Sequence, residues 1–362
     1  MKIVKIVLTG GPCGGKSTAV ERIKEELHKV GYTVLYVNEA ATELIKGGVA
    51  PWTCGTHKDF QHAVLSVQQA KEHAVERAAA TMTDKEKILI ICDRGALDNK
   101  AYLEDGAYSQ FLREIGINEV ELRDSYDGVF HLVTAANGAE AFYTTENNAA
   151  RTETLEEARE LDRRLIAAWT GHPHLRVIDN STNFEGKMRR LVDEIITLLG
   201  EPQPFEIERK YLIEYPDVAW LEAQPNCHRV EIIQTYLTAP DGEETRIRQR
   251  GEGGQYMYFL TVKRKIDEFR REETERRITA EEYLDLLMQA DTTRRQIRKS
   301  RFCLTYEQQY LEIDVYPFWQ DKAILEVELP HEDTPVTLPD VFHVIKEVTD
   351  DPAYKNAALA MI

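Results

Sequence analysis

The sequence is poor in cysteine, and its cysteines lack the spacings that hold metals or build disulfide frameworks. Its 362 residues include five, an odd number with no CxxC pair: Cys13, Cys54, Cys92, Cys227 and Cys303. A disulfide-rich secreted scaffold and a structural zinc site are therefore excluded. A reducing compartment is the simplest interpretation.

A net positive charge and a long apolar run are also missing. The formal net charge is -17, so we expect no non-specific binding to nucleic acid, which depends on cationic contacts to phosphates. No apolar run approaches the roughly 20 residues that a membrane-spanning helix needs. The N-terminus enters an apolar strand directly, in place of a signal peptide. We therefore expect a cytoplasmic protein with no membrane partner.

The length and the position of the prolines indicate two domains. A chain of 362 residues with 43% hydrophobic and 30% charged residues is typical of soluble globular proteins with more than one core. A glycine and two prolines at 200–204 end the last helix of the first half. We predict a P-loop domain at 1–200, a connector at 201–204 and a second domain at 205–362. The oligomeric state is not indicated.

Residues 10–17 match the phosphate-binding motif G-x-x-x-x-G-K-[ST]. They follow an apolar strand at 3–8 and precede a helix, which is the context the motif requires. Glycines let backbone N–H groups surround a phosphate at the positive end of a helix. The predicted nucleotide-binding residues are Gly10, Gly15, Lys16, Ser17 and Thr18. Lys16 is expected to reach the phosphates of ATP or GTP, and Ser17 to ligate Mg²⁺ or Mn²⁺.

Further apolar strands at 32–38, 87–92, 129–133 and 175–178 alternate with helical segments. Such alternation predicts a parallel sheet covered on both faces. Two of these strands end at an acid, Glu39 or Asp93. An acid in this place is a candidate metal ligand in nucleotide-binding α/β domains, which makes Asp93 a metal candidate. A turn residue or helix N-cap is the alternative.

Three arginines surround a predicted helix that begins after the Thr154-x-x-Glu157 capping box. Arg151, Arg159 and Arg163 are placed to form a lid over phosphates. Surface salt bridges are an equally good explanation for each of them.

The first half resembles the P-loop ATPase/kinase-like family. The likeness rests on Asp93-Arg94-Gly95, on the Asn-Asn-x-x-Arg-x-Glu run at 147–153, and on residues 179–182 before Phe184. It is also similar to small-molecule kinases of the nucleoside and nicotinamide riboside type. That resemblance implies that Glu39 would be the base for an acceptor hydroxyl, although it names no acceptor.

The second half carries charged residues at alternate positions of several short apolar segments, so each strand presents a charged face. The sets are Glu206/Glu208/Lys210, Arg246/Arg248/Arg250, Lys263/Lys265, Glu273/Glu275, Lys299/Arg301, Glu312/Asp314 and Glu326/Glu328. A sheet with one solvated face would also alternate, but with both signs scattered and exchangeable for neutral polar residues. Closing such a sheet predicts an α+β domain built on an eight-stranded antiparallel β-barrel, lined with ions. Basic strands suit a polyphosphate, and paired carboxylates suit divalent cations.

Nine ordered segments of this half resemble the CYTH, or triphosphate tunnel metalloenzyme, family. They lie at 206–212, 234–238, 245–249, 260–263, 271–275, 298–302, 311–315, 325–329 and 347–356. The resemblance covers residues 204–362.

This resemblance implies a role for each charged strand. Catalysis would involve Lys210, Glu206 and Glu208. The metal-binding acids would be Glu206, Glu208, Asp314, Glu326 and Glu328, with one Mg²⁺ or Mn²⁺ orienting a triphosphate and a second activating water. The triphosphate would be bound by Arg246, Arg248, Lys263, Lys299 and Arg301.

Three functions stay open on the sequence. The first is a metal-dependent triphosphatase, acting on inorganic tripolyphosphate or on a nucleoside or organic triphosphate, joined to a P-loop domain that turns over ATP or GTP. The second is a small-molecule kinase whose tunnel senses polyphosphate or nucleotide. The third is adenylyl cyclase chemistry, which starts from the same metal-bound triphosphate.

Overall fold

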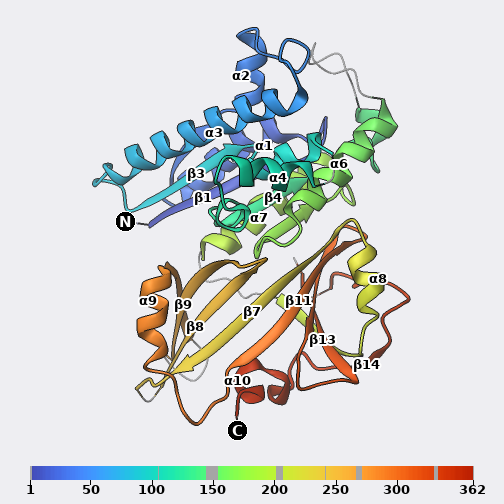
Figure 1. The fold of residues 1–362 in the computed structure, drawn as a ribbon. Helices are drawn as coiled ribbons and strands as arrows, with labels where there is room; N and C mark the ends of the chain where they lie inside the picture. Colours follow the sequence, from blue (N-terminus) through green and yellow to red (C-terminus); the bar gives the residue numbers. More distant parts are fainter. Residues whose placement is uncertain are drawn as a thin grey trace. The chain divides into compact units, whose positions relative to one another are not determined.

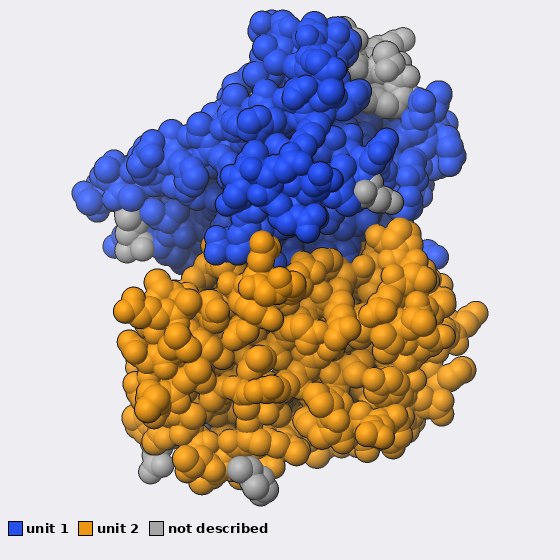
Figure 2. All heavy atoms as spheres, viewed as in Figure 1, with its two compact units in different colours: residues 1–207, 307–310, 330–334 blue, residues 208–306, 311–329, 335–362 orange. Residues whose placement is uncertain are grey.

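A computed structural model describes residues 2–104, 106–143, 154–200, 207–240, 242–265, 271–329 and 333–361. The chain divides into two compact units (Figure 2). Unit 1 comprises 1–207, 307–310 and 330–334, and unit 2 comprises 208–306, 311–329 and 335–362. The predicted connector at 201–204 lies outside the described residues.

Unit 1 contains a five-stranded parallel sheet in the order β2-β3-β1-β4-β5. Figure 1 labels its strands β1, β3 and β4. Its strands are β1 (Lys2–Thr9), β2 (Thr33–Val37), β3 (Lys87–Asp93), β4 (Gly128–Leu132) and β5 (Leu175–Ile178). All four ladders between them are parallel. The predicted parallel α/β architecture is therefore confirmed, with strand ends displaced by at most one residue.

Helices connect these strands. They are α1 (Lys16–Lys29), α2 (Ala40–Lys46), α3 (His57–Ala80), α4 (Ala107–Glu114), α5 (Glu119–Arg123), α6 (Leu155–Trp169) and α7 (Phe184–Leu199), with 3-10 turns η1 (Ala96–Tyr102) and η2 (Glu140–Phe142). The predicted capping box is present at the start of α6, where Thr154 and Glu157 exchange hydrogen bonds of 2.8 and 3.3 Å. No helix that the structure describes is long and apolar enough to cross a bilayer.

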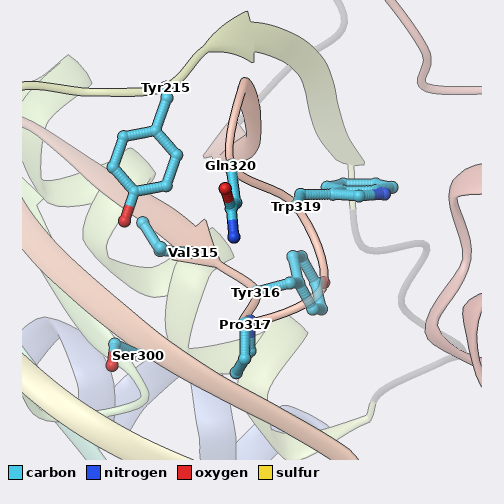
Figure 3. Close-up of a pocket in the computed structure, with 7 residues that line it drawn as sticks. All are labelled: Tyr215, Ser300, Val315, Tyr316, Pro317, Trp319 and Gln320. Carbon is cyan, nitrogen blue, oxygen red and sulfur yellow. The ribbon is translucent and has the colours of Figure 1, made fainter.

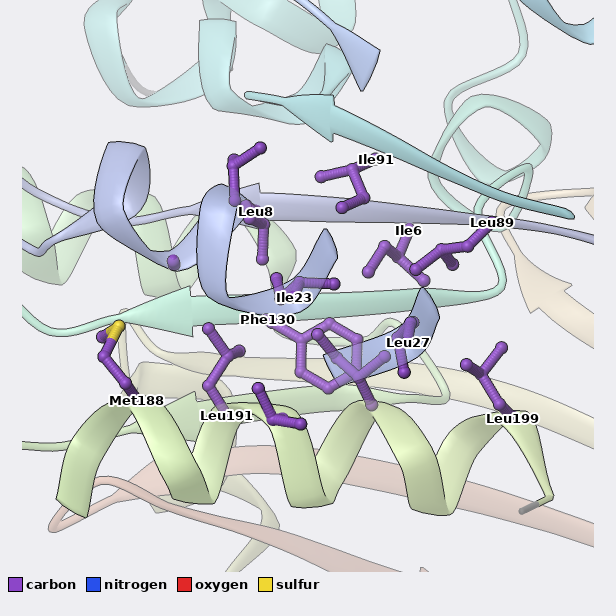
Figure 4. Close-up of a cluster of buried hydrophobic side chains, with 14 of the residues drawn as sticks. Ile6, Leu8, Ile23, Leu27, Leu89, Ile91, Phe130, Met188, Leu191 and Leu199 are labelled. Atoms are coloured by element: carbon purple, nitrogen blue, oxygen red, sulfur yellow. The ribbon is translucent and has the colours of Figure 1, made fainter. Parts of the chain in front are cut away.

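The sheet of unit 1 is buried on both faces, as parallel sheets usually are. On one face, Ile23 and Leu27 of α1 and Leu191 of α7 pack against side chains of β1, β3 and β4 (Figure 4). On the other face, residues of η1, α4 and Trp169 form a second buried cluster with the alternate strand residues. The end of β1 that leads into the phosphate-binding motif is thus held rigidly between two cores.

Unit 2 is built on an antiparallel sheet of nine strands, in the order β10-β9-β8-β7-β11-β12-β13-β6-β14. The strands are β6 (Ile207–Glu214), β7 (Cys227–Leu237), β8 (Glu243–Glu252), β9 (Gln255–Lys265), β10 (Arg271–Ile278), β11 (Ile297–Tyr306), β12 (Gln309–Val315), β13 (Lys322–Leu329) and β14 (Val344–Glu347). Short helices accompany them: α8 (Val218–Ala223), α9 (Ala280–Leu287), η3 (Pro352–Tyr354) and α10 (Asn356–Leu359).

The prediction of a closed eight-stranded barrel is wrong. The sheet has nine strands, and within the described residues no ladder joins the outer strands β10 and β14. The last strand is short and exposed throughout, and its register shifts between Val344 and Lys346. Alternation in a sequence specifies which side chains share a face. Closure depends instead on strand tilt and on pairing between the first and last strands.

We predict that Leu191→Ala destabilises unit 1 by about 2–5 kcal/mol, because it leaves a cavity in a close-packed core. Leu191 is 0% exposed, whereas Leu155, at the start of α6, is 38% exposed and provides a matched Leu→Ala control. Urea unfolding followed by tryptophan fluorescence measures both variants. Equal losses of stability in the two would contradict this description of the core.

Candidate functional site

The phosphate-binding motif forms a tight loop between β1 and α1. Gly15 lies at the helix N-cap with φ 94°, and Gly10 has φ 141°, both in the region that favours glycine. A Cβ at Gly10 would lie 2.1 Å from the carbonyl oxygen of Leu132. No acidic residue occupies the first turn of α1, so the positive end of the helix dipole is not offset locally. The loop therefore has the backbone that anion binding requires.

The predicted phosphate contacts lie at this helix end. Lys16 Nζ donates to the carbonyl oxygen of Gly10 at 3.3 Å, and Ser17 and Thr18 are exposed. Burial and the neighbouring Arg94 charge lower the pKa of Lys16, while Asp93 and Glu39 act in the opposite direction. The tertiary fold thus brings the ends of β2 and β3 within electrostatic reach of the loop lysine.

Asp93 has the features of a metal ligand beside this loop. Its Oδ2 accepts a hydrogen bond of 2.6 Å from the Tyr36 hydroxyl. Its Oδ1 is buried and has no hydrogen-bond partner in the part of the chain that the structure describes. A carboxylate oxygen and the Ser17 hydroxyl are hard donors. Mg²⁺ commonly uses one or two protein oxygens together with phosphates and water, so this pair fits Mg²⁺.

Glu39, the predicted base, is held by an arginine. Arg94 Nε lies 3.2 Å from Glu39 Oε1, and Arg94 has an unusual positive φ of 71°. Burial alone would raise the pKa of Glu39, but the charges of Arg94 and Lys16 bring it below the ordinary value. Arg94 Nη1 is buried without a hydrogen-bond partner among the described residues. Glu39 is therefore an ionised carboxylate beside Arg94, whose Nη1 is available as a hydrogen-bond donor.

The sequence did not identify two residues that fix the loop. Asp162 of α6 accepts from the backbone N–H of Gly11 at 2.8 Å, and the Thr134 hydroxyl donates to the carbonyl oxygen of Pro12 at 2.5 Å. A signal for Asp162 was present, because it lies on the apolar face of α6 with Ala158, Leu165 and Trp169. A carboxylate at such a position needs buried donors.

The arginines predicted as a lid have partners in the protein. Arg159 donates to the carbonyl oxygen of Ala136 at 2.7 Å and pairs with Glu140 at 3.1 Å. Arg163 pairs with Glu160 at 2.6 Å. Arg151 lies outside the described residues. For Arg159 and Arg163 the surface ion-pair explanation is the one that the structure supports.

In unit 2 the charged side chains that the structure describes on β6, β8, β11, β12 and β13 share one face of the sheet, and Arg301 of β11 contacts three of the acids. Its Nε and Nη2 bind the two oxygens of Asp314 at 2.7 Å each, in a bidentate pair. Nη2 also lies 2.9 Å from Glu326, and Nη1 pairs with Glu312. Lys299 pairs with Asp314 as well. One guanidinium thus joins the acids of β12 and β13.

Lys210 of β6 extends this network. Its Nζ lies 2.8 Å from Glu326 Oε1 and 3.5 Å from Glu208 Oε1. Burial would lower the pKa of Lys210, but Glu326 and Glu208 raise it above the ordinary value. Glu328 follows Glu326 at the alternate position of β13 and shares its face. Glu206 lies outside the described residues.

The carboxylates beside Lys210 bear on the predicted metal site. Within the described ranges, no group of three or more His, Cys, Asp or Glu side chains is arranged to hold a metal ion. Glu208 and Glu326 nevertheless converge on one ammonium group. Two carboxylate oxygens suffice for Mg²⁺ when substrate oxygens and water complete the shell, so the residues fit such an ion.

The arginine side chains of β8 lie on the same face of the sheet as Arg301. Arg248 Nη2 lies 2.9 Å from Glu275, which also accepts from Thr261 at 2.7 Å. Arg246 donates to Gln234 at 3.4 Å, and Lys263 follows Thr261 at the alternate position of β9. Burial, together with the charges of Arg246, Arg250 and Arg301, lowers the pKa of Arg248. Cations of β8 and β11 are therefore near enough to repel one another.

An apolar layer lies next to the charged residues. Leu212, Ile297 and Tyr316 lie two positions along the chain from Lys210, Lys299 and Asp314, respectively. These three belong to one buried cluster with Tyr236 and Ile324. The layer keeps water from one end of the charged face, which strengthens the electrostatic interactions there.

A separate cavity of about 380 Å³ is lined by Tyr215, Ser300, Val315, Tyr316, Pro317, Trp319 and Gln320 (Figure 3). Ser300 and Val315 alternate with Lys299, Arg301 and Asp314, so they point to the opposite side of the sheet. None of the predicted site residues lines this cavity.

Comparison with known proteins finds one matching family model and several similar proteins. A family model described as an AAA domain matches residues 5–187, which is half of the chain. An inorganic triphosphatase of Nitrosomonas europaea is 34% identical over 160 residues, covering 43% of this chain and 97% of that protein. A crystal structure of an inorganic triphosphatase is 32% identical, covers 44% of this chain and 95% of that chain, and gives a TM-score of 0.32. A hypothetical protein of known structure is 32% identical, with coverages of 44% and 99% and a TM-score of 0.33.

We predict a pH-dependent stability contribution from Lys187, a buried residue of α7 beside the loop. Its Nζ donates to the carbonyl oxygen of Val133 at 2.6 Å and to Asn180 at 2.8 Å. Burial lowers the pKa of Lys187 from 10.5 to about 8, against the opposing effect of Asp162. Between pH 8 and 10.5 the unfolded chain keeps a proton that the folded chain has released. The unfolding free energy therefore rises with pH in this window, by up to about 3 kcal/mol.

Lys187→Met removes this contribution. Urea unfolding of wild type and variant at pH 7.5 and pH 10 measures it, and we expect the stability of wild type relative to the variant to be higher at pH 10. A difference that is the same at both pH values would contradict the prediction.

Proposed function

We propose that this chain, which belongs to the AAA domain family through residues 5–187 and to the family of the inorganic triphosphatase that it matches over 160 residues, hydrolyses a triphosphate in unit 2 and binds ATP or GTP in unit 1. The substrate of unit 2 is inorganic tripolyphosphate or a nucleoside or organic triphosphate. The reaction is hydrolysis of a phosphoanhydride.

The observation that carries the proposal for unit 2 is the row of partly buried cations on one sheet face. Lys299, Arg301 and Lys210 are paired with carboxylates at present, and Arg248 Nε is buried without a hydrogen-bond partner in the described part of the chain. A triphosphate carries several negative charges and needs fixed cations along its length. Arg246 and Lys263 add charge on the neighbouring strands.

Divalent metal dependence is part of the proposal. Glu208 and Glu326 would hold Mg²⁺ or Mn²⁺, together with Glu206, Glu328 and Asp314. A bound metal supplies charge neutralisation and a more acidic water. The protein's own contribution is positioning. Lys210 and Arg301 would hold the phosphoryl groups in line, while the apolar layer next to them keeps water from one end of the charged face.

The proposal for unit 1 rests on the loop geometry. Gly10 and Gly15 shape the backbone that surrounds a phosphate, and Lys16 supplies the cation. Ser17 and Asp93 would hold Mg²⁺, as the hard oxygen donors at that end of the sheet. This role is supported by Asp93 Oδ1, which is buried and has no hydrogen-bond partner among the described residues.

A small-molecule kinase activity in unit 1 is the second candidate. It is favoured by Glu39, which is an ionised carboxylate within electrostatic reach of Lys16. A base that accepts a proton from an acceptor hydroxyl must lie close to the transferred phosphoryl group.

We predict that the full chain releases phosphate from tripolyphosphate with Mg²⁺ or Mn²⁺ and that Lys210→Ala lowers kcat/KM by about 10²–10³-fold, because a charge that positions the phosphates is lost. Lys16→Ala is the matched control, since it removes a lysine from the other site. It should leave tripolyphosphate hydrolysis unchanged and abolish binding of Mg·ATP, measured by calorimetry.

Three results would argue against this assignment. One is an absence of phosphate release from every triphosphate tested by a folded protein. Another is loss of tripolyphosphate hydrolysis in Lys16→Ala. Formation of cyclic AMP from ATP would instead select cyclase chemistry at the same face.

For the kinase candidate, we predict that Glu39→Gln lowers the rate of ATP turnover in unit 1 by about 10²-fold or more, because a general base is lost. The affinity of the variant for Mg·ATP should stay unchanged. A turnover assay in the Lys210→Ala background isolates unit 1. Unchanged turnover in Glu39→Gln would rule out this role for Glu39.

A further inference from the structure

A buried carboxylate contacts the phosphate-binding loop of unit 1. Asp162 on α6 is 3% exposed. One of its oxygens, Oδ1, faces three nitrogens: the backbone N–H of Gly11 at 2.8 Å, the backbone N–H of Thr134 at 3.1 Å, and His131 Nε2 at 3.0 Å. All three contacts use the same atom, so the side chain acts as a single fixed acceptor.

A negative charge in this place requires an explanation. The charge of Asp162 would repel an anion bound by the loop that this side chain contacts. Its burial is also costly unless hydrogen-bond donors compensate. Burial would raise the pKa of Asp162, but His131 and the two backbone N–H groups bring it below the ordinary value. An apolar residue would satisfy the packing of α6 without these costs. The carboxylate therefore satisfies donors that an apolar residue would leave unpaired, and one of them is the Gly11 N–H of the loop.

The loop fits closely around this contact. A Cβ on Gly11 would lie 2.6 Å from Asp162 Oδ1 and 3.0 Å from Thr134 Cβ. The motif G-x-x-x-x-G-K-[ST] allows any residue at position 11, so the motif does not explain this glycine. The next residue of the loop is held as well, because the Thr134 hydroxyl donates a hydrogen bond to the carbonyl oxygen of Pro12 at 2.5 Å. The Gly11 N–H is thus bound by a side chain of α6, and the Pro12 carbonyl oxygen by Thr134, which follows β4.

We propose that Asp162 is a positioning residue for nucleotide binding. By accepting the Gly11 N–H, it orients the start of the loop so that the later N–H groups of the loop face the phosphates. It also links the loop to α6. The inference rests on the proposed nucleotide binding of unit 1. Because one oxygen makes all three contacts, an amide oxygen at the same place can replace it.

The test compares two changes at Asp162 in the full chain. Asp162→Ala removes the acceptor and leaves buried donors unpaired, so we expect Mg·ADP affinity, measured by calorimetry, to fall by about 10-fold to 100-fold. Asp162→Asn keeps an acceptor oxygen and should stay within about 3-fold of wild type. Hydrogen exchange of the peptide covering residues 10–15 should rise in Asp162→Ala and stay near wild type in Asp162→Asn.

Two further variants keep the test decisive. Asp84→Ala is the matched control, because Asp84 is an exposed carboxylate that pairs with Lys85, and it should behave as wild type. Gly11→Ala displaces the loop without changing Asp162. It should weaken Mg·ADP binding to a similar extent even if Asp162→Ala fails to fold.

The outcomes separate this inference from the proposed function. Unchanged affinity and exchange in Asp162→Ala, or unchanged affinity in Gly11→Ala, would overturn the positioning role. Asp162→Asn as weak as Asp162→Ala would also overturn it, since charge and not the acceptor would then matter. If wild type binds no nucleotide, the proposed function of unit 1 fails. Loop exchange then decides alone whether Asp162 holds the loop.

Discussion

A charge removed from water must be neutralised by groups within reach, and both candidate sites are arranged around this constraint. In unit 2, Arg301 is neutralised by Asp314, Glu312 and Glu326 on the neighbouring strands. Lys210 shares Glu326 with it. The acids and bases of this face are therefore each other's partners.

Unit 1 meets the same constraint with backbone groups and a few side chains. The loop has its own N–H donors and the helix end, so fewer fixed cations are needed. Asp162 satisfies the Gly11 N–H at the base of the loop. Arg94 and Glu39 neutralise one another beside Lys16. Buried atoms without partners among the described residues, Asp93 Oδ1 and Arg94 Nη1, lie on the strand end next to the loop.

The two sheets place their sites differently. In the parallel sheet both faces are occupied by core, so functional groups gather where strands end and loops begin. In the antiparallel sheet one face is covered by an apolar cluster with α9, and the other carries the charges beside a second apolar cluster. This is why charged alternation along strands was informative in the second half, whereas in the first half the signals were a glycine motif and acids after strands.

The sequence by itself determined the parallel α/β unit, the phosphate-binding motif and the shared face of the charged strands, because these follow from local periodicity and spacing. It did not determine whether the antiparallel sheet closes, since closure depends on pairing between strands far apart in the chain. Nor did it identify Asp162 or the partners of Arg301. Those depend on which elements the fold brings together, and only the tertiary structure decided that Asp162 reaches Gly11 across 151 positions of sequence.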